Sequence, residues 1–346
     1  MTWLWNLLGA VLGYTAIASL LTRAWRPASA PHIRQSGMPI PGTETLEVLT
    51  WNLGYGALGA EAEFLADGGT KLRALGRRQI DDAAQRIAGH LAAPPAEVLF
   101  LQEVAAPGFM TRGVDVRGRI EAALPRHRHV FASDLKTRGF PQALSFNHGL
   151  SVFTSYTAED AQITTLPRAS KLYAGFLRKH YFGVATRVPI AGTGKAWRLI
   201  NIHLPAFDAD ARDRIAQLDA LLEIAQLAYA QGEHVVIGGD WNLRLRPTDF
   251  PHATEERHLF WIHDIPEDIL PDGWAWVTDP QVPTVRTLNA PFQAGVSYTT
   301  IIDGFLVSPN VEVLQVATDD LGFADTDHHP VRARLRARLP ATDAGG

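Results

Sequence analysis

The pattern of hydrophobic and polar positions divides the chain into three stretches. Residues 2–22 carry no charged side chain, and a run of about 20 apolar residues predicts one continuous helix. Residues 23–44 contain four prolines and show no regular period, so they predict an extended proline-rich linker. From residue 45 to residue 340 apolar runs of strand and helix length follow one another without an internal repeat. We expect one continuous domain there and a flexible tail over residues 341–346.

Short apolar runs within the domain are typical of β-strands. The runs that we expect as strands are 46–51, 97–101, 148–155, 181–188, 197–203, 235–238, 300–308 and 331–339. Two further segments, residues 71–91 and 210–231, have apolar side chains near helical spacing. The second is followed by Gly232, a typical signal for the end of a helix.

Polar residues capable of chemistry stand at the ends of several of these runs. They are Asn52, Glu103, His203, Asp240 with Asn242, and Asp327 with His328 just before the last run. Enzymes built on sheets present their site residues at strand ends, so these side chains are candidates for one shared site. Each is weak by itself, because an asparagine after a strand is usually a turn residue and a single histidine is more often structural. The segments 238–242 and 327–330 are more specific.

A membrane anchor is the preferred interpretation of residues 1–22. Trp3 and Trp5 at the start and two arginines after the end match the aromatic and basic flanks of membrane spans. A buried core helix is an alternative, but the run has no polar face. A cleaved signal segment is another, but no basic residue precedes the run and the arginines separate it from the small residues 28–30. We expect a single-pass N-terminal anchor, with the side of the membrane that holds the domain left open.

Composition limits the chemistry that the chain can perform. Of its 346 residues 46% are hydrophobic and 20% are charged, which is enough for a buried core. Cysteine is absent, so thiolate nucleophiles, iron–sulfur clusters and cysteine-based zinc sites are excluded, and a metal needs His, Asp, Glu or Asn ligands. With 32 basic and 36 acidic side chains the formal net charge is −4, which gives no support to broad electrostatic capture of nucleic acid. A nuclease is still compatible with this, because the local charge at a site matters more than the total.

Seven short motifs follow one another along the domain: TWN (50–52), LQE (101–103), GLSVFTS (149–155), NIHL (201–204), GDWN (239–242), IDGFLVS (302–308) and TDHHPV (326–331). Their order resembles the endonuclease/exonuclease/phosphatase superfamily, which includes pancreatic-type deoxyribonucleases, apurinic-site endonucleases, neutral sphingomyelinases and inositol polyphosphate 5-phosphatases. The resemblance implies an α/β fold, a four-layer sandwich of two mixed β-sheets flanked by helices. It also implies hydrolysis of a phosphoester with a divalent metal, Mg²⁺ in the first place and Mn²⁺ as the alternative.

The resemblance implies a metal-binding role for three of the candidates. Glu103 is the best candidate for a direct ligand, since a carboxylate suits Mg²⁺. Asn52 would assist there or hold a phosphate oxygen. Asp327 corresponds to a second carboxylate on the side of the metal.

The remaining residues would act on water and phosphate. Asp240 matches the residue that orients or deprotonates the attacking water, and Asn242 the residue that fixes its geometry. His328 would donate to the phosphoryl oxygens as an imidazolium, with Asp303 on its far nitrogen. His203 matches a second histidine of the deoxyribonuclease and sphingomyelinase branches, a candidate donor to the phosphate or to the leaving oxygen.

A few further positions have weaker support. Arg286, ahead of the IDGF strand, is a candidate phosphate contact, and an ordinary surface arginine is the alternative. Lys171 and Lys179 are weaker candidates of the same kind. We expect His329 to be structural, because the family's catalytic histidine is the one directly after the aspartate.

Three hypotheses for the substrate stay open. The first is a membrane-tethered phosphodiesterase that acts on a phospholipid-like or other small phosphodiester. The second is an endonuclease that acts on DNA or RNA. The third is a catalytically silent interaction module, which is the least supported because every expected catalytic group is present. Aromatic residues over 258–276 fit a lipid interface and fit equally well the packing of a long loop. No obligate protein partner is evident.

Overall fold

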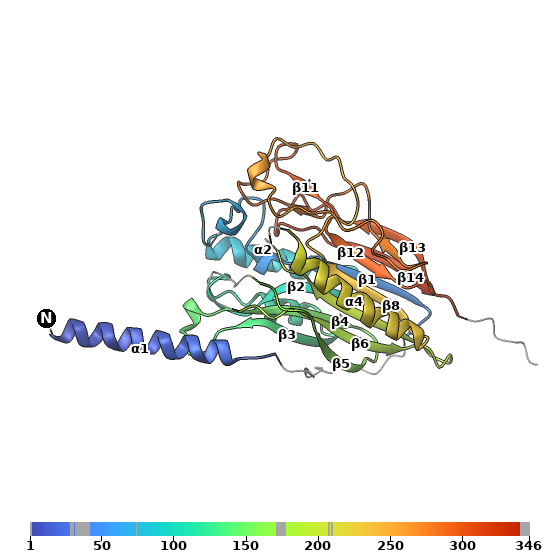
Figure 1. Ribbon diagram of the computed structural model, residues 1–346, viewed down its shortest axis with the longest axis horizontal. Coiled ribbons are helices and arrows are strands. Elements are labelled where there is room, and N and C mark those ends of the chain that lie inside the picture. Colours follow the sequence, from blue (N-terminus) through green and yellow to red (C-terminus); the bar gives the residue numbers. More distant parts are fainter. Residues whose placement is uncertain are drawn as a thin grey trace, which may run out of the picture.

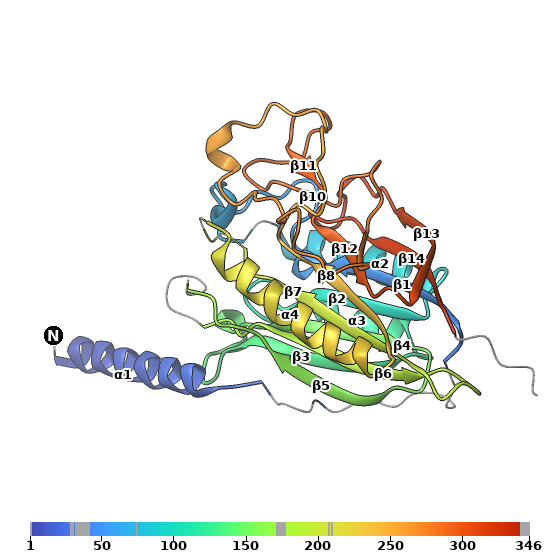
Figure 2. The same cartoon turned by 45° about the vertical axis from the view of Figure 1, so that its right-hand side comes forward.

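The computed structural model describes residues 2–27, 31, 42–73, 75–170, 178–206, 208 and 210–339 of the chain. After residue 44 the chain forms two six-stranded β-sheets packed face to face, with helices on their outer faces (Figure 1). The same layers are seen after a turn of the molecule (Figure 2). The four-layer α/β sandwich expected from the sequence is thus confirmed. Most of the predicted linker and the whole predicted tail fall outside the described residues.

Each sheet has one parallel pair of strands at its centre and antiparallel pairs around it. The first sheet has the order β13 (Val311–Thr318), β14 (Val331–Ala337), β1 (Thr45–Asn52), β2 (Val98–Ala105), β4 (Asn147–Thr154) and β3 (Arg128–Lys136). The second has the order β5 (Glu159–Thr165), β6 (Phe182–Pro189), β7 (Ala196–His203), β8 (His234–Asp240), β12 (Asp303–Val307) and β9 (Ala275–Val277). The parallel pairs are β1 with β2 and β7 with β8, so the polar residues that end these strands lie at one end of the sandwich.

The central strands are buried on both faces, which explains their continuous apolar sequences. In β2, Val98 and Phe100 pack between the two sheets, whereas Leu99 and Leu101 pack toward the outer helices. Because side chains alternate along a strand, one apolar run supplies two layers of core. Phe305 of β12 contributes to the layer between the sheets from the opposite side.

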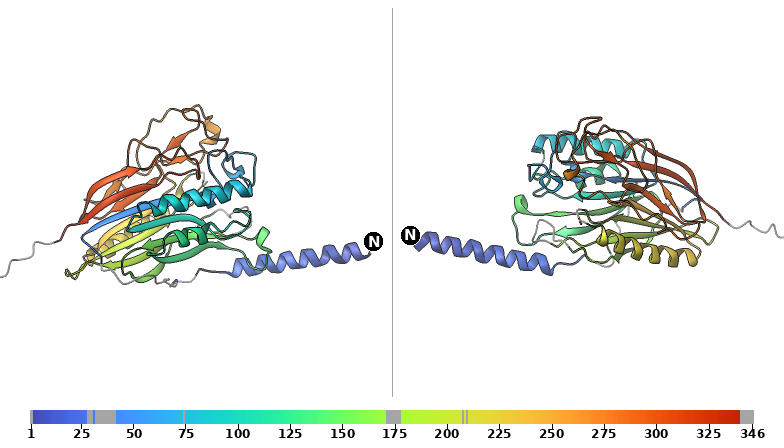
Figure 3. Two further views of the ribbon diagram at one scale, coloured as in Figure 1. Left: turned by 180° about the vertical axis from the view of Figure 1, so that it is seen from behind. Right: turned by 45° about the horizontal axis from the view of Figure 1, so that its top comes forward.

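The helices lie on opposite outer faces of the sandwich (Figure 3). Helices α2 (Arg77–Ala92) and α3 (Val116–Ala123) pack on the first sheet, and α4 (Arg212–Ala230) packs on the second. Helix α2 begins at Arg77, later than the predicted residue 71, because the chain turns there. The side chain of Gln79 accepts a hydrogen bond from the backbone of Gly76 at 2.9 Å and so closes the first turn.

The predicted strand over residues 300–308 is divided in two. Strand β11 (Thr299–Thr300) pairs with β10 (Val285–Arg286) in a small separate sheet, and β12 pairs with β8. Between them the Thr284 hydroxyl accepts hydrogen bonds from the backbone of Ile302 and Asp303, both at 3.0 Å. These bonds satisfy the amides that leave one sheet before the chain enters the other.

The aromatic residues of the 258–276 segment follow a short helical turn, η4 (Glu256–His258), and most of them pack inward. Trp261 and Trp274 are buried, whereas Phe260 is 43% exposed. Packing under a loop, one of the two alternatives considered for this segment, therefore describes its tryptophans.

The predicted apolar helix is α1 (Thr2–Ala24), which extends from one end of the domain (Figure 1). Residues Trp3–Thr22 are long and apolar enough to cross a membrane, and 6% of them are buried. The second half of α1 contacts the turn between β3 and β4. The Thr22 hydroxyl accepts a hydrogen bond from the backbone of Arg138 at 3.0 Å, and the Tyr14 hydroxyl donates to the carbonyl of Gly139.

Candidate active site

The ends of strands β1, β2, β7 and β8 meet at one cavity with a volume of about 600 Å³. Eight of the nine site residues expected from the sequence line this cavity: Asn52, Glu103, His203, Asp240, Asn242, Arg286, Asp327 and His328. The ninth, Asp303, lies directly behind His328. Residues separated by hundreds of positions in the sequence are therefore neighbours here.

A buried hydrogen-bond network fixes the two sheets to each other behind the cavity. The Gln102 side-chain amide donates to the Thr50 hydroxyl at 3.1 Å and to Asn201 Oδ1 at 2.7 Å. The Asn201 amide in turn donates to the carbonyls of Leu101 at 3.1 Å and Ser151 at 2.9 Å. Because these groups are fully buried, sliding one sheet past the other would leave them unsatisfied. The network thus holds the strand ends in register.

Asp240 is at the centre of the polar cluster. Its Oδ2 accepts a hydrogen bond from Asn52 Nδ2 at 2.9 Å, and its Oδ1 accepts one from the backbone amide of Asn242 at 2.9 Å. The same Oδ2 lies 3.4 Å from His203 Nε2 and 3.8 Å from His328 Nε2. Burial raises the pKa of Asp240 above its usual range. A fixed carboxylate of this kind is suited to hold and deprotonate a water molecule.

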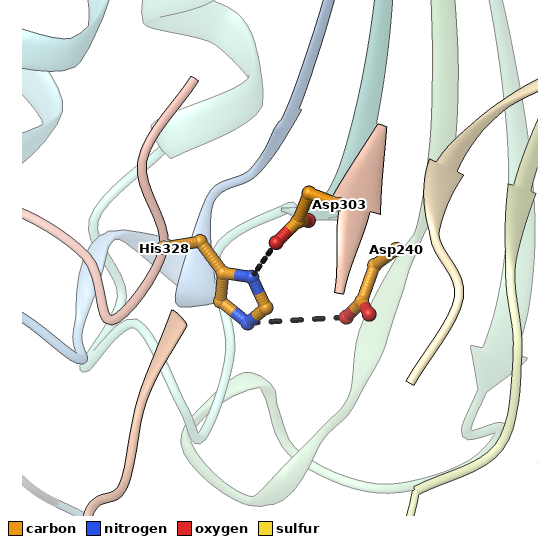
Figure 4. Close-up of side chains that lie close together, drawn as sticks. All are labelled: Asp240, Asp303 and His328. Atoms are coloured by element: carbon orange, nitrogen blue, oxygen red, sulfur yellow. Dashed lines mark hydrogen bonds and ion pairs between the residues drawn. The ribbon is translucent and has the colours of Figure 1, made fainter. Parts of the chain in front are cut away.

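His328 and Asp303 form the pair that was expected from the sequence. Figure 4 shows Asp240, Asp303 and His328 pointing toward one another. His328 Nδ1 lies 2.9 Å from Asp303 Oδ2, which places a proton on Nδ1 and directs Nε2 toward Asp240. Burial alone would lower the pKa of His328, but Asp303, Asp327 and Asp240 together raise it to about 10. An imidazolium in this position is a donor for phosphoryl oxygens.

The acidic side of the cavity fits a hard divalent cation. Burial raises the pKa of Glu103 to about 8 and also raises that of Asp327, because the surrounding protein does not balance their charges. The Tyr55 hydroxyl donates to Glu103 Oε1 at 2.9 Å. A cation between these carboxylates would hold them ionised, and their oxygens, together with Asn52, are the ligand type that Mg²⁺ prefers. Asp240, Asp303 and His328 are a second group that could hold a metal ion, because they offer ligand atoms within 4.8 Å of one another. The hydrogen bond between Asp303 and His328 already uses Nδ1 of the histidine, so we prefer the site at Glu103 and Asp327.

Several backbone conformations at the cavity are rare for residues with a side chain. Tyr55, Glu103 and Asn242 have φ angles of 58°, 53° and 50°. Such left-handed residues carry conformational strain that is found often at functional sites. Gly54 has a φ of 49°, and a Cβ atom there would lie 2.7 Å from Asp327 Oδ1. The loop after β1 therefore needs glycine where it approaches the carboxylate.

Asn242 and His203 also hold specific positions at the cavity. The Asn242 amide donates to the carbonyl of Leu204 at 2.9 Å, next to His203. Burial and the charge of Lys179 lower the pKa of His203 well below its usual range, which favours the neutral imidazole. His203 Nδ1 is buried and has no hydrogen-bond partner among the described residues.

Arg286 is placed differently from a phosphate ligand. Its side chain is 1% exposed, and its terminal nitrogens donate to backbone carbonyls. The acceptors are Leu58 at 3.3 Å, Gly59 at 2.7 Å and Ala62 at 3.3 Å in the loop after β1, together with Thr287 and Ala290. These contacts favour a role in holding that loop, although the guanidinium also lines the cavity. Lys171 lies outside the described residues.

His329, expected to be structural, is fully engaged by its surroundings. Its Nε2 accepts a hydrogen bond from the backbone of Phe323 at 3.0 Å, and its Nδ1 lies 2.8 Å from the carbonyl of Pro283. The ring also stacks on Phe323 at a centroid distance of 3.8 Å. This histidine thus anchors the segment that precedes β14.

Sequence reasoning missed part of the cavity wall. Lys179, considered only as a weak candidate, has a side chain that is 8% exposed, and its Nζ lies 3.4 Å from Asp134 Oδ2. His148 Nδ1 lies 2.8 Å from Asp134 Oδ1. Burial alone would raise the pKa of Asp134, but Lys179 and His148 lower it to about 2. The only sequence signal for Tyr55 was the glycine-rich loop that contains it. The only signal for Asp134 was the alternating pattern of β3, which was not recognised as a strand.

A protein-family model described as the Endonuclease/Exonuclease/phosphatase family matches residues 49–328. No curated protein sequence matches the chain. The match covers every strand end that contributes to the cavity.

Several solved structures share the fold at low sequence identity. An endonuclease/exonuclease/phosphatase from Beutenbergia cavernae DSM 12333 is 19% identical, with a TM-score of 0.57 over 86% of this chain and 73% of that one. TDP2 from D. rerio, complexed with a single-strand DNA product, is 15% identical, with a TM-score of 0.54 over 85% and 99%. The catalytic domain of human Nocturnin, with a bound sulfate anion, is 14% identical, with a TM-score of 0.52 over 89% and 97%. At these identities the likeness concerns the fold alone.

Proposed function

The chain belongs to the endonuclease/exonuclease/phosphatase family, and we propose that it is a divalent-metal-dependent phosphodiesterase held at a membrane by helix α1. Members of this family hydrolyse phosphoesters, and its fold serves phosphodiesterases and nucleases in general. The observation that carries the proposal is the convergence of Asp240, the His328–Asp303 pair and the carboxylates of Glu103 and Asp327 on one cavity.

The proposed reaction begins with a water molecule on Asp240. Asn52 and the backbone of Asn242 fix both carboxylate oxygens, so the carboxylate can take the proton of a water placed in the cavity. The water oxygen bonds to phosphorus while the ester P–O bond breaks. The hydroxyl of water thus ends on the phosphate, and the proton that Asp240 took passes to the leaving alkoxide through His203, whose Nε2 lies 3.4 Å from Asp240 Oδ2. His203 remains the candidate donor to that leaving oxygen.

His328 stabilises the charge that develops on the phosphate. Its Nδ1 is committed to Asp303, so Nε2 is the atom that can donate to a phosphoryl oxygen. Asp303 is fully buried and positions the ring, while Asp327 and Asp240 favour its protonated form. This is the carboxylate–imidazole logic that recurs on unrelated folds.

The proposed metal site consists of Glu103 and Asp327 with Asn52. When bound there, Mg²⁺, or Mn²⁺ as the alternative, would neutralise phosphate charge and polarise the phosphoryl group. Tyr55 holds one oxygen of Glu103 in place and leaves the other for a ligand role.

The test of this function uses the full chain in detergent micelles with ethyl 4-nitrophenyl phosphate as a generic diester. We expect release of 4-nitrophenolate with Mg²⁺ or Mn²⁺ and none after chelation. Asp240→Asn should remove the activity, whereas Asp272→Asn, at an exposed position, is the matched control and should retain it. Metal-independent turnover, or full activity of Asp240→Asn, would contradict the proposal.

Attachment to a membrane is the second part of the proposal. It rests on the length and apolar character of Trp3–Thr22 and on the exposure of that helix. Fractionation of cells that express the full chain should place the protein with membranes after washing in high salt. Recovery in the soluble fraction, with residues 2–22 still present, would contradict the anchor.

A nucleic-acid substrate is the second candidate. It is favoured by the fold that the chain shares with TDP2 from D. rerio, which is complexed with a single-strand DNA product. A silent interaction module is the third, and turnover of no diester at all would favour it.

A further inference from the structure

The cavity has a large apolar wall beside its polar cluster. Leu58, Phe64, Phe109, Met110, Phe146 and Trp261 line it. A volume of about 600 Å³ is in the range of pockets that enclose a complete small ligand, so a phosphate group alone leaves most of it unfilled. The chemistry of hydrolysis does not need this wall. It therefore indicates what is attached to the phosphate.

The mouth of the cavity is apolar as well. Leu65 and Leu72 line the cavity, and they are 52% and 64% exposed. Lining residues that reach solvent mark the side on which a cavity is open. Exposed leucines beside an apolar wall are typical of a surface that receives an apolar partner.

The charge of the lining does not suit a polyanion. Six acidic side chains line the cavity, against three basic ones, Lys179, Arg286 and His328. Lys179 is 3.4 Å from Asp134, and Arg286 donates to backbone carbonyls. Binding of a nucleic acid needs basic groups that neutralise successive phosphates. A single phosphodiester fits this lining better than a strand of DNA or RNA.

Helix α1 meets the domain next to this cavity. Its Thr22 bonds to Arg138 and its Tyr14 to Gly139, both in the turn between β3 and β4. In the same turn the Thr137 amide donates to the carbonyl of Phe146 at 2.9 Å, and Phe146 belongs to the apolar wall. The anchor and the wall thus share one hairpin.

A second contact joins the residue after α1 to a neighbour of the cavity residue Lys179. The ring of Trp25 packs edge-on against His180 at a centroid distance of 5.4 Å, and His180 follows the cavity residue Lys179. In two views the helix extends from the end of the body where the β3–β4 hairpin and the loop after β1 lie (Figures 1 and 2). A bilayer crossed by α1 would therefore face the end of the sandwich that holds the cavity.

We propose that the substrate is an amphiphilic phosphodiester of the bilayer, with its phosphate at the polar cluster and its hydrocarbon chain against the apolar wall. This rests on the proposed phosphodiesterase function and names its substrate class. The chain of the lipid enters past the exposed leucines from the membrane side. Each methylene buried in the wall improves binding by up to about fourfold.

The experiment compares alkyl 4-nitrophenyl phosphates with ethyl, butyl and octyl chains, hydrolysed by the full chain in micelles with Mg²⁺. The leaving group is the same in all three, so their chemical reactivity is matched. We expect kcat/KM to rise on the order of a hundredfold from ethyl to octyl, less than complete burial of six methylenes would give. A variant with Leu65→Asn and Leu72→Asn should reduce the octyl-to-ethyl ratio at least tenfold.

Leu227→Asn is the matched control, because Leu227 is 66% exposed on α4 and does not line the cavity. It should keep the ratio of the native chain, which separates a contact in the cavity from partition into micelles. Melting temperatures of both variants should equal that of the native protein, since the replaced side chains are exposed.

The outcomes distinguish the two proposals. Hydrolysis of all three diesters with equal kcat/KM, or an unchanged ratio in the double variant, would overturn the lipid assignment and leave the phosphodiesterase standing. Single-stranded DNA as a better substrate than the octyl diester would do the same in favour of a nuclease. Hydrolysis of no diester would overturn the proposed function itself.

Discussion

Replacement of Arg286 separates the two roles considered for this residue. Its guanidinium donates to the carbonyls of Leu58, Gly59 and Ala62, and its backbone amide donates to the carbonyl of Asp327 at 3.1 Å. The residue therefore joins the loop after β1 to the segment that carries Asp327. We expect Arg286→Met to loosen the loop after β1 and to keep the backbone bond to Asp327, whereas a phosphate ligand would leave the fold intact when replaced.

The loss of stability follows from the backbone carbonyls that Arg286→Met leaves without a hydrogen-bond donor. A buried polar group that loses its partner costs about 1–3 kcal/mol. The bond to Gly59 is short at 2.7 Å, and those to Leu58 and Ala62 are long at 3.3 Å, so the first contributes most. We take the total as about 3 kcal/mol, which lowers the Tm by roughly 5 °C in a domain of about 300 residues.

The assay measures Tm and kcat on the generic diester for Arg286→Met and for Arg78→Met as the matched control. The Arg78 side chain is 95% exposed, so its replacement should change neither quantity. For Arg286→Met we expect the lower Tm together with a lower kcat, because the loop after β1 carries Tyr55, which holds Glu103. An unchanged Tm with a raised KM would refute this reasoning and restore Arg286 as a phosphate contact.

Four further predictions concern the polar cluster and its surroundings. Asp240→Asn should reduce kcat by about 10²–10⁴ with an unchanged fold by circular dichroism, since it removes the proposed base; a smaller loss would assign that role elsewhere. His328→Ala and Asp303→Asn should each lower kcat, and the double variant should lose little more than His328→Ala, because the two act as one unit; additive losses would contradict the pair. Mg²⁺ should raise the Tm of the native chain but not of Glu103→Gln, and equal shifts would place the cation elsewhere. Burial raises the pKa of Asp67 to about 7 from an unfolded value of 3.8. The folded chain should therefore lose up to about 4 kcal/mol of stability as the pH rises from 4 to 7. Denaturant titrations should show this loss for the native chain and not for Asp67→Asn.

The sequence predicted those parts of the fold that depend on local pattern. Two strands show how this works, the one that ends at Asn52 and the one that ends at Asp240. Both are mostly buried and therefore mostly apolar, so each run and the polar residue that ends it can be recognised in the sequence. The cavity was predicted because the polar residues follow such runs in the order that the family has. Seven of the nine expected residues line it for this reason.

The remaining features depend on contacts that have no local signal. Nothing in the short segment around Arg286 indicates its role. The carbonyls that accept its hydrogen bonds belong to a loop that is distant in the sequence and folds over it. Strand β3, which brings Asp134 beside Lys179, is irregular opposite β4 and was not recognised as a strand. The start of α2 depends on Gly76 as its N-terminal cap, which interrupts a helical pattern that begins earlier.

The apolar wall and the charged cluster of the cavity act on each other. Apolar surroundings deprive a charge of water, so they raise the pKa of Glu103 and make its ionised form dependent on a cation. They also strengthen the donation of His328 to a phosphate once water has been excluded. A substrate with a hydrocarbon chain would complete this enclosure, because its chain would displace water from Phe146 and Trp261 as its phosphate reaches Asp240. A substrate without such a chain would leave the wall wet, so the same residues should catalyse its hydrolysis less well.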